Sequence, residues 1–149
     1  MRVTARDFFN PGEQEEIRQA VLDTEMETSG EIRIHIENSC KGDVLDRAAF
    51  IFKKLKMHKT FLRNGVLIYL AIDQHKFAIL GDKGIHKVAP ENFWDDIREG
   101  MVKFFRQNDF TGGLCYAITA AGEQLKKYFP RKSDDINELA DDISFGKIK

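Results

Sequence analysis

The strongest constraint on the fold is a run of seven apolar residues at positions 66–72. A strand with one face in water alternates apolar and polar residues, so an unbroken run predicts a strand buried on both faces. Residues 73–76 then supply a polar turn, and residues 77–80 are typical of a second apolar strand. We therefore expect an antiparallel hairpin at the centre of the fold, with its two outer ends side by side.

A second strand is expected at residues 31–37, where isoleucine alternates strictly with polar side chains. This pattern predicts one covered face and one wetter face, toward an edge of the sheet. Between this strand and the hairpin, residues 44–55 carry a wide apolar helical face, and Asp43 is a good N-cap. A strand, a helix and a buried strand in this order form a right-handed crossover, which makes the two strands parallel.

Three further helices are expected, one on each side of this region and one near the end. They begin at Pro11, at Pro90 and at about Phe110. Together these elements predict an α/β fold, a three-layer α/β/α sandwich with a small mixed sheet (a βαββ core) flanked by helices. We expect residues 1–130 to form one domain and residues 131–149 an acidic tail, with Ile136, Leu139 and Ile143 spaced for one short helix.

Composition narrows the class of protein. The 149 residues carry 23 basic and 24 acidic side chains, so the molecule as a whole has no attraction to nucleic acid or to an anionic membrane. Its two cysteines are not a disulfide framework. The first residues lack the apolar core of a signal peptide, and no apolar run is long enough for a membrane helix. These features predict a soluble, cytoplasmic protein.

Topology places the ends of three strands together at one end of the sheet. Glycines allow tight turns and close approach of a ligand, and carboxylates from separate strands can share a hard cation such as Ca²⁺ or Mg²⁺. The alternative is that the two glycines around position 82 only make a turn that Asp82 caps. The candidate metal ligands here are Glu31, Asn64 and Asp82, and the candidate cofactor-binding positions are Gly81, Gly84, Asn64 and Gly65.

A second candidate cation cluster lies at the opposite end of the sheet. It contains Asp43, Asp46 and Asp109. Ligands of open α/β sheets usually bind at the carboxyl ends of parallel strands, which favours this end. The alternative is that Asp43 and Asp46, three residues apart at a helix start, serve as a cap and a dipole partner.

The other polar features have simpler interpretations. Each of the four histidines is expected at the surface or in a turn, because none has metal-ligand spacing. Cys40 has no His–Asp partnership visible in the sequence that would make it a nucleophile. The basic residues at 53–63 predict a solvated helix face, since RNA binding would require exposed aromatic residues and Phe52 and Phe61 are expected to be buried.

The order of these signatures resembles the TPM domain, the family of thylakoid lumen phosphatase-like and photosystem II repair proteins. The resemblance covers roughly residues 10–129 and implies an α/β/α sandwich, divalent-metal binding and, in some members, a weak acid phosphatase activity. Other members resemble assembly or turnover factors for membrane proteins. The matching pieces are Ser29-Gly30-Glu31-Ile32, Arg63-Asn64-Gly65-Val66-Leu67-Ile68, Ala78-Ile79-Leu80-Gly81-Asp82-Lys83-Gly84-Ile85 and Asn108-Asp109-Phe110-Thr111-Gly112-Gly113.

The sequence departs from the family pattern at the metal-binding end. Arg63 stands where the family commonly has an aspartate, and two residues rather than one separate Gly81 from Gly84. The resemblance leads to one hypothesis of metal-assisted phosphomonoester hydrolysis, in which Asp82 helps to hold the cation and Lys83 or Arg63 holds the substrate's charge. The alternative hypothesis is a non-enzymatic interaction module that binds a partner protein through the acidic tail or an edge strand.

Overall fold

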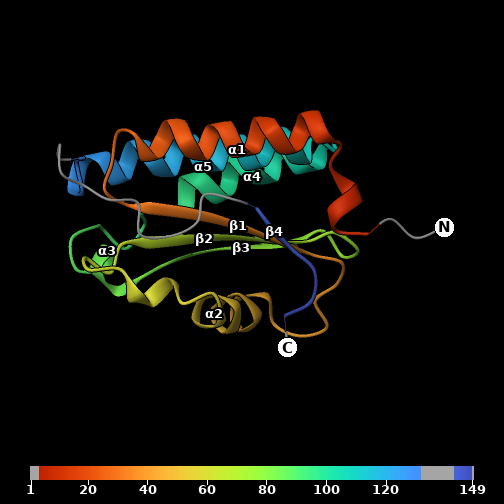
Figure 1. Ribbon diagram of the computed structural model, residues 1–149, viewed down its shortest axis with the longest axis horizontal. Coiled ribbons are helices and arrows are strands. Elements are labelled where there is room, and N and C mark those ends of the chain that lie inside the picture. The colour runs from red at the N-terminus through yellow and green to blue at the C-terminus, as the bar shows by residue number, and fades with distance from the viewer. Residues whose placement is uncertain (1–3, 132–142, 149) are drawn as a thin grey trace.

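The centre of the fold is a four-stranded mixed sheet, and the computed structural model describes it within residues 4–131 and 143–148 (Figure 1). The strand order is β3-β2-β1-β4. The strands are β1 (Glu31–Glu37), β2 (Gly65–Ala71), β3 (Lys76–Gly81) and β4 (Ser144–Phe145). The hairpin predicted from the apolar run is therefore β2 and β3, and β3 forms one edge of the sheet.

Strand pairing confirms the predicted βαββ core. β1 pairs with β2 in parallel, with Glu31 opposite Gly65, and β2 pairs with β3 in antiparallel register, with Val66 opposite Gly81. The two-residue strand β4 comes from the tail and pairs in parallel with β1 beside His35. The sequence pattern did not predict this fourth strand.

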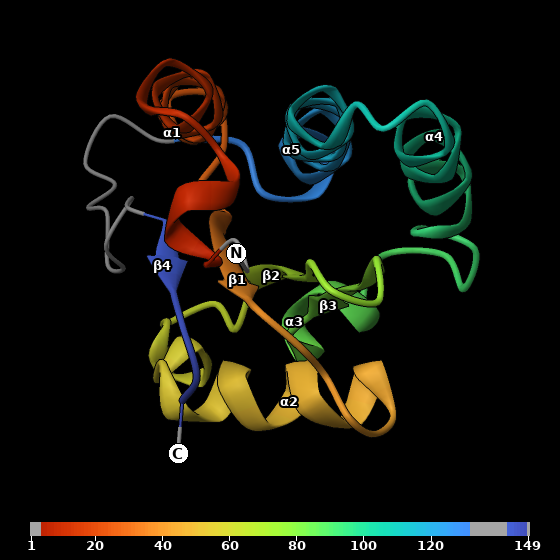
Figure 2. The same ribbon diagram turned by 90° about the vertical axis from the view of Figure 1, so that its right-hand side faces the viewer.

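Helices cover both faces of the sheet, so the predicted three-layer sandwich is confirmed (Figure 2). One face carries α1 (Pro11–Glu25), α4 (Asp95–Arg106) and α5 (Phe110–Tyr128), and the other carries α2 (Val44–Lys54). The short helix α3 (Lys83–His86) follows β3, and single 3₁₀ turns lie at Arg6–Phe8 and Met57–Lys59. Within the described ranges, no helix is long and apolar enough to cross a membrane.

The helix starts follow local capping chemistry. Asn10 accepts a hydrogen bond from the Glu13 amide while the Glu13 carboxylate accepts one from the Asn10 amide, which is a capping box. The helix expected at Pro90 begins later, at Asp95. The reason is that the Phe93 amide bonds the Pro90 carbonyl at 3.0 Å, closing an isolated turn before the helix.

The core has one cluster on each side of the sheet. Alternate residues of β2 point to opposite faces, and every residue of the strand is buried, as the apolar run predicted. The three isoleucines of β1 belong to the core cluster between the sheet and the layer of α1, α4 and α5. Leu67 and Tyr69 pack with Ile51 of α2 on the other side. Fully burying one such side chain stabilises the fold by about 1.5–3 kcal/mol.

Two expectations about exposure were wrong. Three of the four polar residues of β1 are buried rather than wet, because α2 and the segment after residue 142 both cover this face. Phe61, expected in the core, is 89% exposed, because it lies in a turn closed by the bond from the Arg63 amide to the Thr60 carbonyl. Phe52 is buried as predicted. The helix expected in the tail falls largely on residues outside the described ranges, although Ile143 is described and buried.

Candidate functional site

The first predicted cluster lies at the end of the sheet where β1 and β2 begin and β3 ends. The Glu31 amide bonds the Asn64 carbonyl at 3.4 Å, and the Asp82 amide bonds the Gly65 carbonyl at 2.9 Å. Topology had predicted this neighbourhood of backbone positions, and Glu31, Asn64 and Asp82 are all buried there. Capping by Asp82 was one of the predicted alternatives, and its ion pair with Arg63 was not predicted.

Asp82 is held by Arg63 in a two-point ion pair. Arg63 Nε donates to Asp82 Oδ2 at 2.7 Å, and Arg63 Nη2 donates to Oδ1 at 3.0 Å. The same Oδ1 accepts the Lys83 amide at 2.7 Å, which caps α3. The hydrogen bonds to Asp82 raise the pKa of the Arg63 guanidinium. Because a guanidinium already neutralises both carboxylate oxygens, these residues do not fit a divalent cation at Asp82.

The neighbouring polar and glycine positions have roles in packing. Asn64 Nδ2 donates to Ser29 Oγ at 3.4 Å, which joins the loops before β1 and β2. A Cβ at Gly81 would meet the Trp94 ring, and one at Gly84 would clash with the backbone carbonyls of residues 62 and 63. These contacts account for both glycines without a ligand, and the side chain of Lys83 is exposed beside them.

The second predicted cluster is divided between two layers of the fold. Asp43 caps α2 by accepting the amides of Leu45 and Asp46 at 2.8 and 3.0 Å. Asp109 caps α5, on the opposite face of the sheet, by accepting the Gly112 amide at 2.8 Å. The predicted capping alternative therefore describes Asp43 correctly. Asp43 and Asp46 lie together, and Asp109 is not part of their surroundings.

Asp43 and Asp46 line a cleft of about 600 Å³ at the carboxyl end of β1. The loop of residues 38–42 forms one wall and the first turns of α2 form the other. This is the end of the sheet that the parallel-strand rule favours. The remaining lining residues are Glu37, Asn38, Ser39, Cys40, Lys41, Gly42, Arg47, Phe50 and Lys147.

Behind this cleft lies a buried polar network that the sequence analysis missed. Glu37 Oε1 accepts Arg47 Nε at 2.9 Å and the Tyr69 hydroxyl at 2.7 Å, while Oε2 accepts Arg47 Nη2 at 2.6 Å. Burial alone would raise the pKa of Glu37, but the hydrogen bonds from Arg47 and Tyr69 outweigh it and hold that pKa below its usual value. Burial, reinforced by the bond to Glu37, raises the pKa of Tyr69 well above its usual value.

The segment after residue 142 closes this network. His35, predicted at the surface, is fully buried, with Nδ1 at 2.6 Å from Ser144 Oγ and Nε2 at 2.9 Å from the Gly146 carbonyl. A carbonyl only accepts, so Nε2 carries the proton. In the neutral ring Nδ1 then accepts from the Ser144 hydroxyl, whose oxygen also lies 3.3 Å from the Ile34 carbonyl. Farther on, the Ile148 amide donates to Glu37 Oε2 at 3.2 Å. Burial lowers the pKa of His35.

A signal for this network was present in the sequence. A three-layer sandwich covers both faces of its sheet, so the polar side of an alternating strand inside it must also be buried. Buried polar groups require partners, and Arg47 lies one helical turn after the Asp43 cap, on a helix packed against that side. The alternation alone, without the layer argument, led to the wrong exposure for His35 and Glu37.

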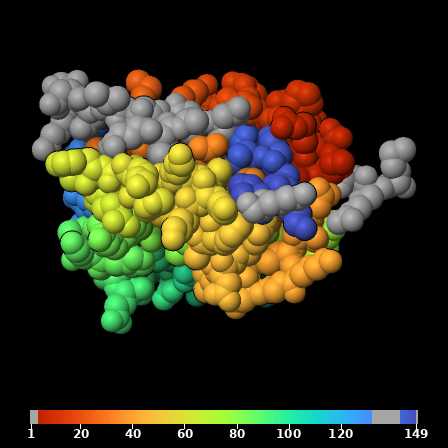
Figure 3. Space-filling view, turned by 60° about the horizontal axis from the view of Figure 1, so that its bottom comes forward, coloured from red at the N-terminus to blue at the C-terminus, as the bar shows by residue number. Residues whose placement is uncertain are grey.

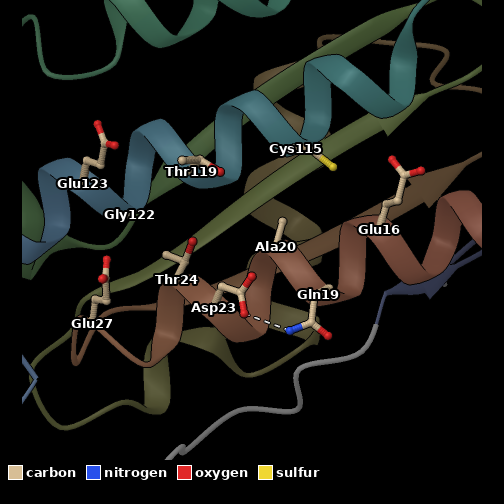
Figure 4. Close-up of a pocket in the computed structure, with 10 residues that line it drawn as sticks. All are labelled: Glu16, Gln19, Ala20, Asp23, Thr24, Glu27, Cys115, Thr119, Gly122 and Glu123. Atoms are coloured by element: carbon tan, nitrogen blue, oxygen red, sulfur yellow. Dashed lines mark hydrogen bonds between the residues drawn. The ribbon is translucent and has the colours of Figure 1, made fainter.

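A groove of about 570 Å³ runs between α1 and α5 on the other face of the molecule (Figure 4). Its acidic lining residues are Glu16, Asp23, Glu27 and Glu123, and burial raises the pKa of the Cys115 thiol at its edge. Across the described residues, no three His, Cys, Asp or Glu side chains are grouped so as to hold a metal ion. Acidic residues lining a groove do not by themselves define a site.

Comparison with known proteins identifies the class that this fold represents. The sequence profile of the TPM domain matches residues 3–124, and the chain belongs to the TPM domain family. Among solved structures, the NMR structure of the BA42 protein from the psychrophilic bacterium Bizionia argentinensis superposes with a TM-score of 0.89 at 47% sequence identity, covering 93% of this chain and 96% of that one.

A second solved structure shares the fold alone. The N-terminal domain of a protein from P. gingivalis superposes with a TM-score of 0.67 at 17% identity, covering 81% of this chain and 78% of that one. No curated protein matches the sequence. The family resemblance read from the four motifs is thus confirmed, and the structural likeness extends over most of the chain.

Proposed function

We propose that this TPM domain binds a divalent cation weakly at the cleft beside α2, with Asp43 and Asp46 as its charged ligands. The observation that carries the proposal is that both carboxylates line one cleft at the carboxyl end of β1. Asp43 Oδ1 is engaged in capping, and Oδ2 accepts no hydrogen bond from any residue that the structure describes. At the other end of the sheet, Arg63 already neutralises Asp82.

The chemistry of the cleft suits Ca²⁺ better than Mg²⁺. Ca²⁺ accepts six to eight oxygen ligands in flexible geometry, including backbone carbonyls, whereas Mg²⁺ requires a near-ideal octahedron. The loop of residues 38–42 supplies carbonyl and side-chain oxygens beside the two carboxylates. Lys41 and Lys147 also line the cleft and oppose a cation. With two carboxylates and nearby lysines we expect a dissociation constant of about 10⁻⁴–10⁻³ M.

A calcium titration followed by NMR amide shifts tests the location. We expect saturable shifts in residues 38–47, and their loss in the Asp43→Asn/Asp46→Asn double variant, since asparagine preserves the cap and removes the charge. Asp109→Asn is the matched control, an identical change at the cap of α5. Shifts confined to residues 63–65 and 82–84 would transfer the site to the other end. The absence of any saturable shift up to about 10 mM Ca²⁺ would refute cation binding.

Phosphomonoester hydrolysis stays a prediction for this chain. The residues proposed to carry it, Arg63, Asp82 and Lys83, lie together, but the carboxylate and the guanidinium neutralise each other. An assay of a generic phosphomonoester with the wild type and Asp82→Ala separates the two hypotheses. Equal background turnover by both proteins would favour the non-enzymatic module, and turnover lost with Asp82 would favour the enzyme.

A further inference from the structure

An apolar turn protrudes from the surface between α2 and β2. The Arg63 amide donates to the Thr60 carbonyl at 3.2 Å, so Phe61 and Leu62 are the two central residues of a β-turn. Phe61 is 89% exposed and Leu62 is 47% exposed. Gly, Asn, Asp and Ser usually occupy such central positions, because their side chains suit the turn and its solvent. Two large apolar side chains there contribute little to the core.

Buried residues on both sides hold this turn in place. Met57, just before it, is fully buried. Thr60 is also buried, and its Oγ1 accepts the Asn64 amide at 3.3 Å. Behind the turn, the Gly84 amide of α3 donates to the Arg63 carbonyl at 2.9 Å. The turn therefore presents Phe61 and Leu62 outward from a fixed support.

The segment of the chain that carries the turn contains basic residues and no acidic ones. Residues 47–72 contain no aspartate or glutamate. A hollow of about 520 Å³ lies on this surface, formed by the last turns of α2 and the 3₁₀ turn that follows (yellow in Figure 3). None of its lysines forms an ion pair with a described residue. The residues that line it are Phe50, Lys53, Lys54, Lys56, His58 and Lys59.

We propose that this surface docks on an anionic lipid membrane, with Phe61 and Leu62 inserted among the lipid headgroups and the four lysines contacting lipid phosphates. Lysines near an anionic leaflet and apolar side chains at its interface are the two elements of peripheral membrane binding. The near-neutral net charge of the whole molecule does not oppose this docking. The attraction between the lysines and the lipid phosphates is screened by salt and acts only within about 10 Å.

The side chains favour a lipid surface over a nucleic acid. Binding of single strands depends on exposed aromatic rings that stack on bases. Phe61 is the exposed ring of the turn, but its neighbour Leu62 has none, and the Phe50 ring already makes cation–π contacts with Arg47 at 5.1 Å and Lys54 at 5.5 Å from its centroid. An exposed apolar pair in a turn, directly after a segment rich in lysines, supplies both the apolar and the cationic contacts that an anionic membrane interface offers.

Vesicle co-sedimentation with the full chain tests this proposal. We expect binding to phosphatidylcholine vesicles that contain roughly 30 mol% phosphatidylserine, little binding to phosphatidylcholine alone, and a clear loss of binding as salt rises from about 0.05 to 0.5 M. A separate titration with a fluorescent single-stranded RNA oligonucleotide at the same low salt tests the alternative that the surface binds a nucleic acid. This part of the test requires no variant.

Two pairs of substitutions separate the contributions of the turn and the lysines. Phe61→Ser/Leu62→Ser should weaken vesicle binding about tenfold or more, because it removes the inserted apolar area. Lys53→Gln/Lys54→Gln should weaken it about 25-fold, from a contribution of about fivefold per lysine. The matched controls are Met26→Ser, which removes an apolar side chain that is 73% exposed at the C-cap of α1, and Lys103→Gln/Arg106→Gln in the last turn of α4. Both should bind as the wild type does.

Several outcomes would overturn the proposal. Equal binding to neutral and anionic vesicles, or salt-independent binding, would remove the electrostatic basis. Wild-type binding by the Phe61→Ser/Leu62→Ser variant would exclude insertion of the turn. RNA binding without vesicle binding would assign the surface to a nucleic acid. Thermal unfolding of each variant checks that the fold is retained, which is expected because the substituted side chains lie at the surface.

Discussion

The buried Glu37 carboxylate offers a sharp test of what holds α2 against the sheet. Glu37 is 2% exposed at its side chain, and two of its hydrogen bonds come from the Arg47 guanidinium, which is 23% exposed. Arg47→Met keeps the aliphatic stem of the side chain and removes the charge. Among the described residues, the Tyr69 hydroxyl and the Ile148 amide then remain as hydrogen-bond donors to the buried carboxylate, and His35 Nε2 lies 3.7 Å from Oε2.

The size of the effect follows from this arrangement. Breaking a buried ion pair by removing one partner costs about 3–5 kcal/mol. Because two hydrogen-bond donors remain and Arg47 is partly exposed, we expect a cost at the lower end, about 3 kcal/mol. With an m value of about 2 kcal/mol/M, the urea midpoint falls by about 1.5 M at neutral pH. The penalty should shrink as the pH falls toward 5, because the unpaired Glu37 has a raised pKa and takes up a proton.

Urea unfolding followed by circular dichroism measures this loss, with Glu37→Gln/Arg47→Met as the companion variant. The double variant has no buried charge to leave unpaired, so it should regain much of the stability that Arg47→Met loses. A loss below about 1 kcal/mol, or a loss that does not change with pH, would show that the carboxylate is solvated and that the buried network does not contribute as described.

Two further changes test other parts of the structure. His35 has a lowered pKa in the folded state, so the unfolded chain binds the proton more tightly and stability falls as the pH drops below about 6.5. In urea titrations at several pH values, His35→Gln should lose this part of the acid sensitivity. An unchanged pH profile of stability would contradict the burial of His35. Gly84→Ala places a methyl group against the backbone carbonyls of residues 62 and 63 and should lower stability by about 1–3 kcal/mol. Gly42→Ala, where a Cβ meets nothing within 4 Å, should be nearly neutral in the same thermal unfolding experiment.

The fold was largely predictable because its signals are local. The apolar run of β2, the alternation of β1 and the side-chain caps at Asn10 and Asp43 each act within a few residues. β4 was not predictable in this way. It contributes two paired residues, and its place beside β1 depends on contacts with His35, 109 positions away from Ser144.

The sequence predicted where the candidate site residues lie in the fold, but not which side chains bind one another. Strand order placed Arg63 and Asp82 at one end of the sheet, but whether a guanidinium binds the carboxylate or an incoming anion depends on side-chain geometry. The cluster of Asp43, Asp46 and Asp109 fails as a unit for a different reason. The helices that carry these residues lie on opposite faces of the sheet, and the sequence pattern did not assign each helix to a face.

The bonds between His35 and residues 144–146 also constrain the order of folding. Contacts across 109 residues require the intervening chain to be gathered first, at an entropic cost that local contacts do not carry. During synthesis, β1, α2 and β2 are all complete long before residue 144 is added, so one edge of β1 stays unpaired until then. A nascent chain that stops short of this segment exposes a histidine and a glutamate along an unpaired strand edge, where quality-control factors and neighbouring chains have access.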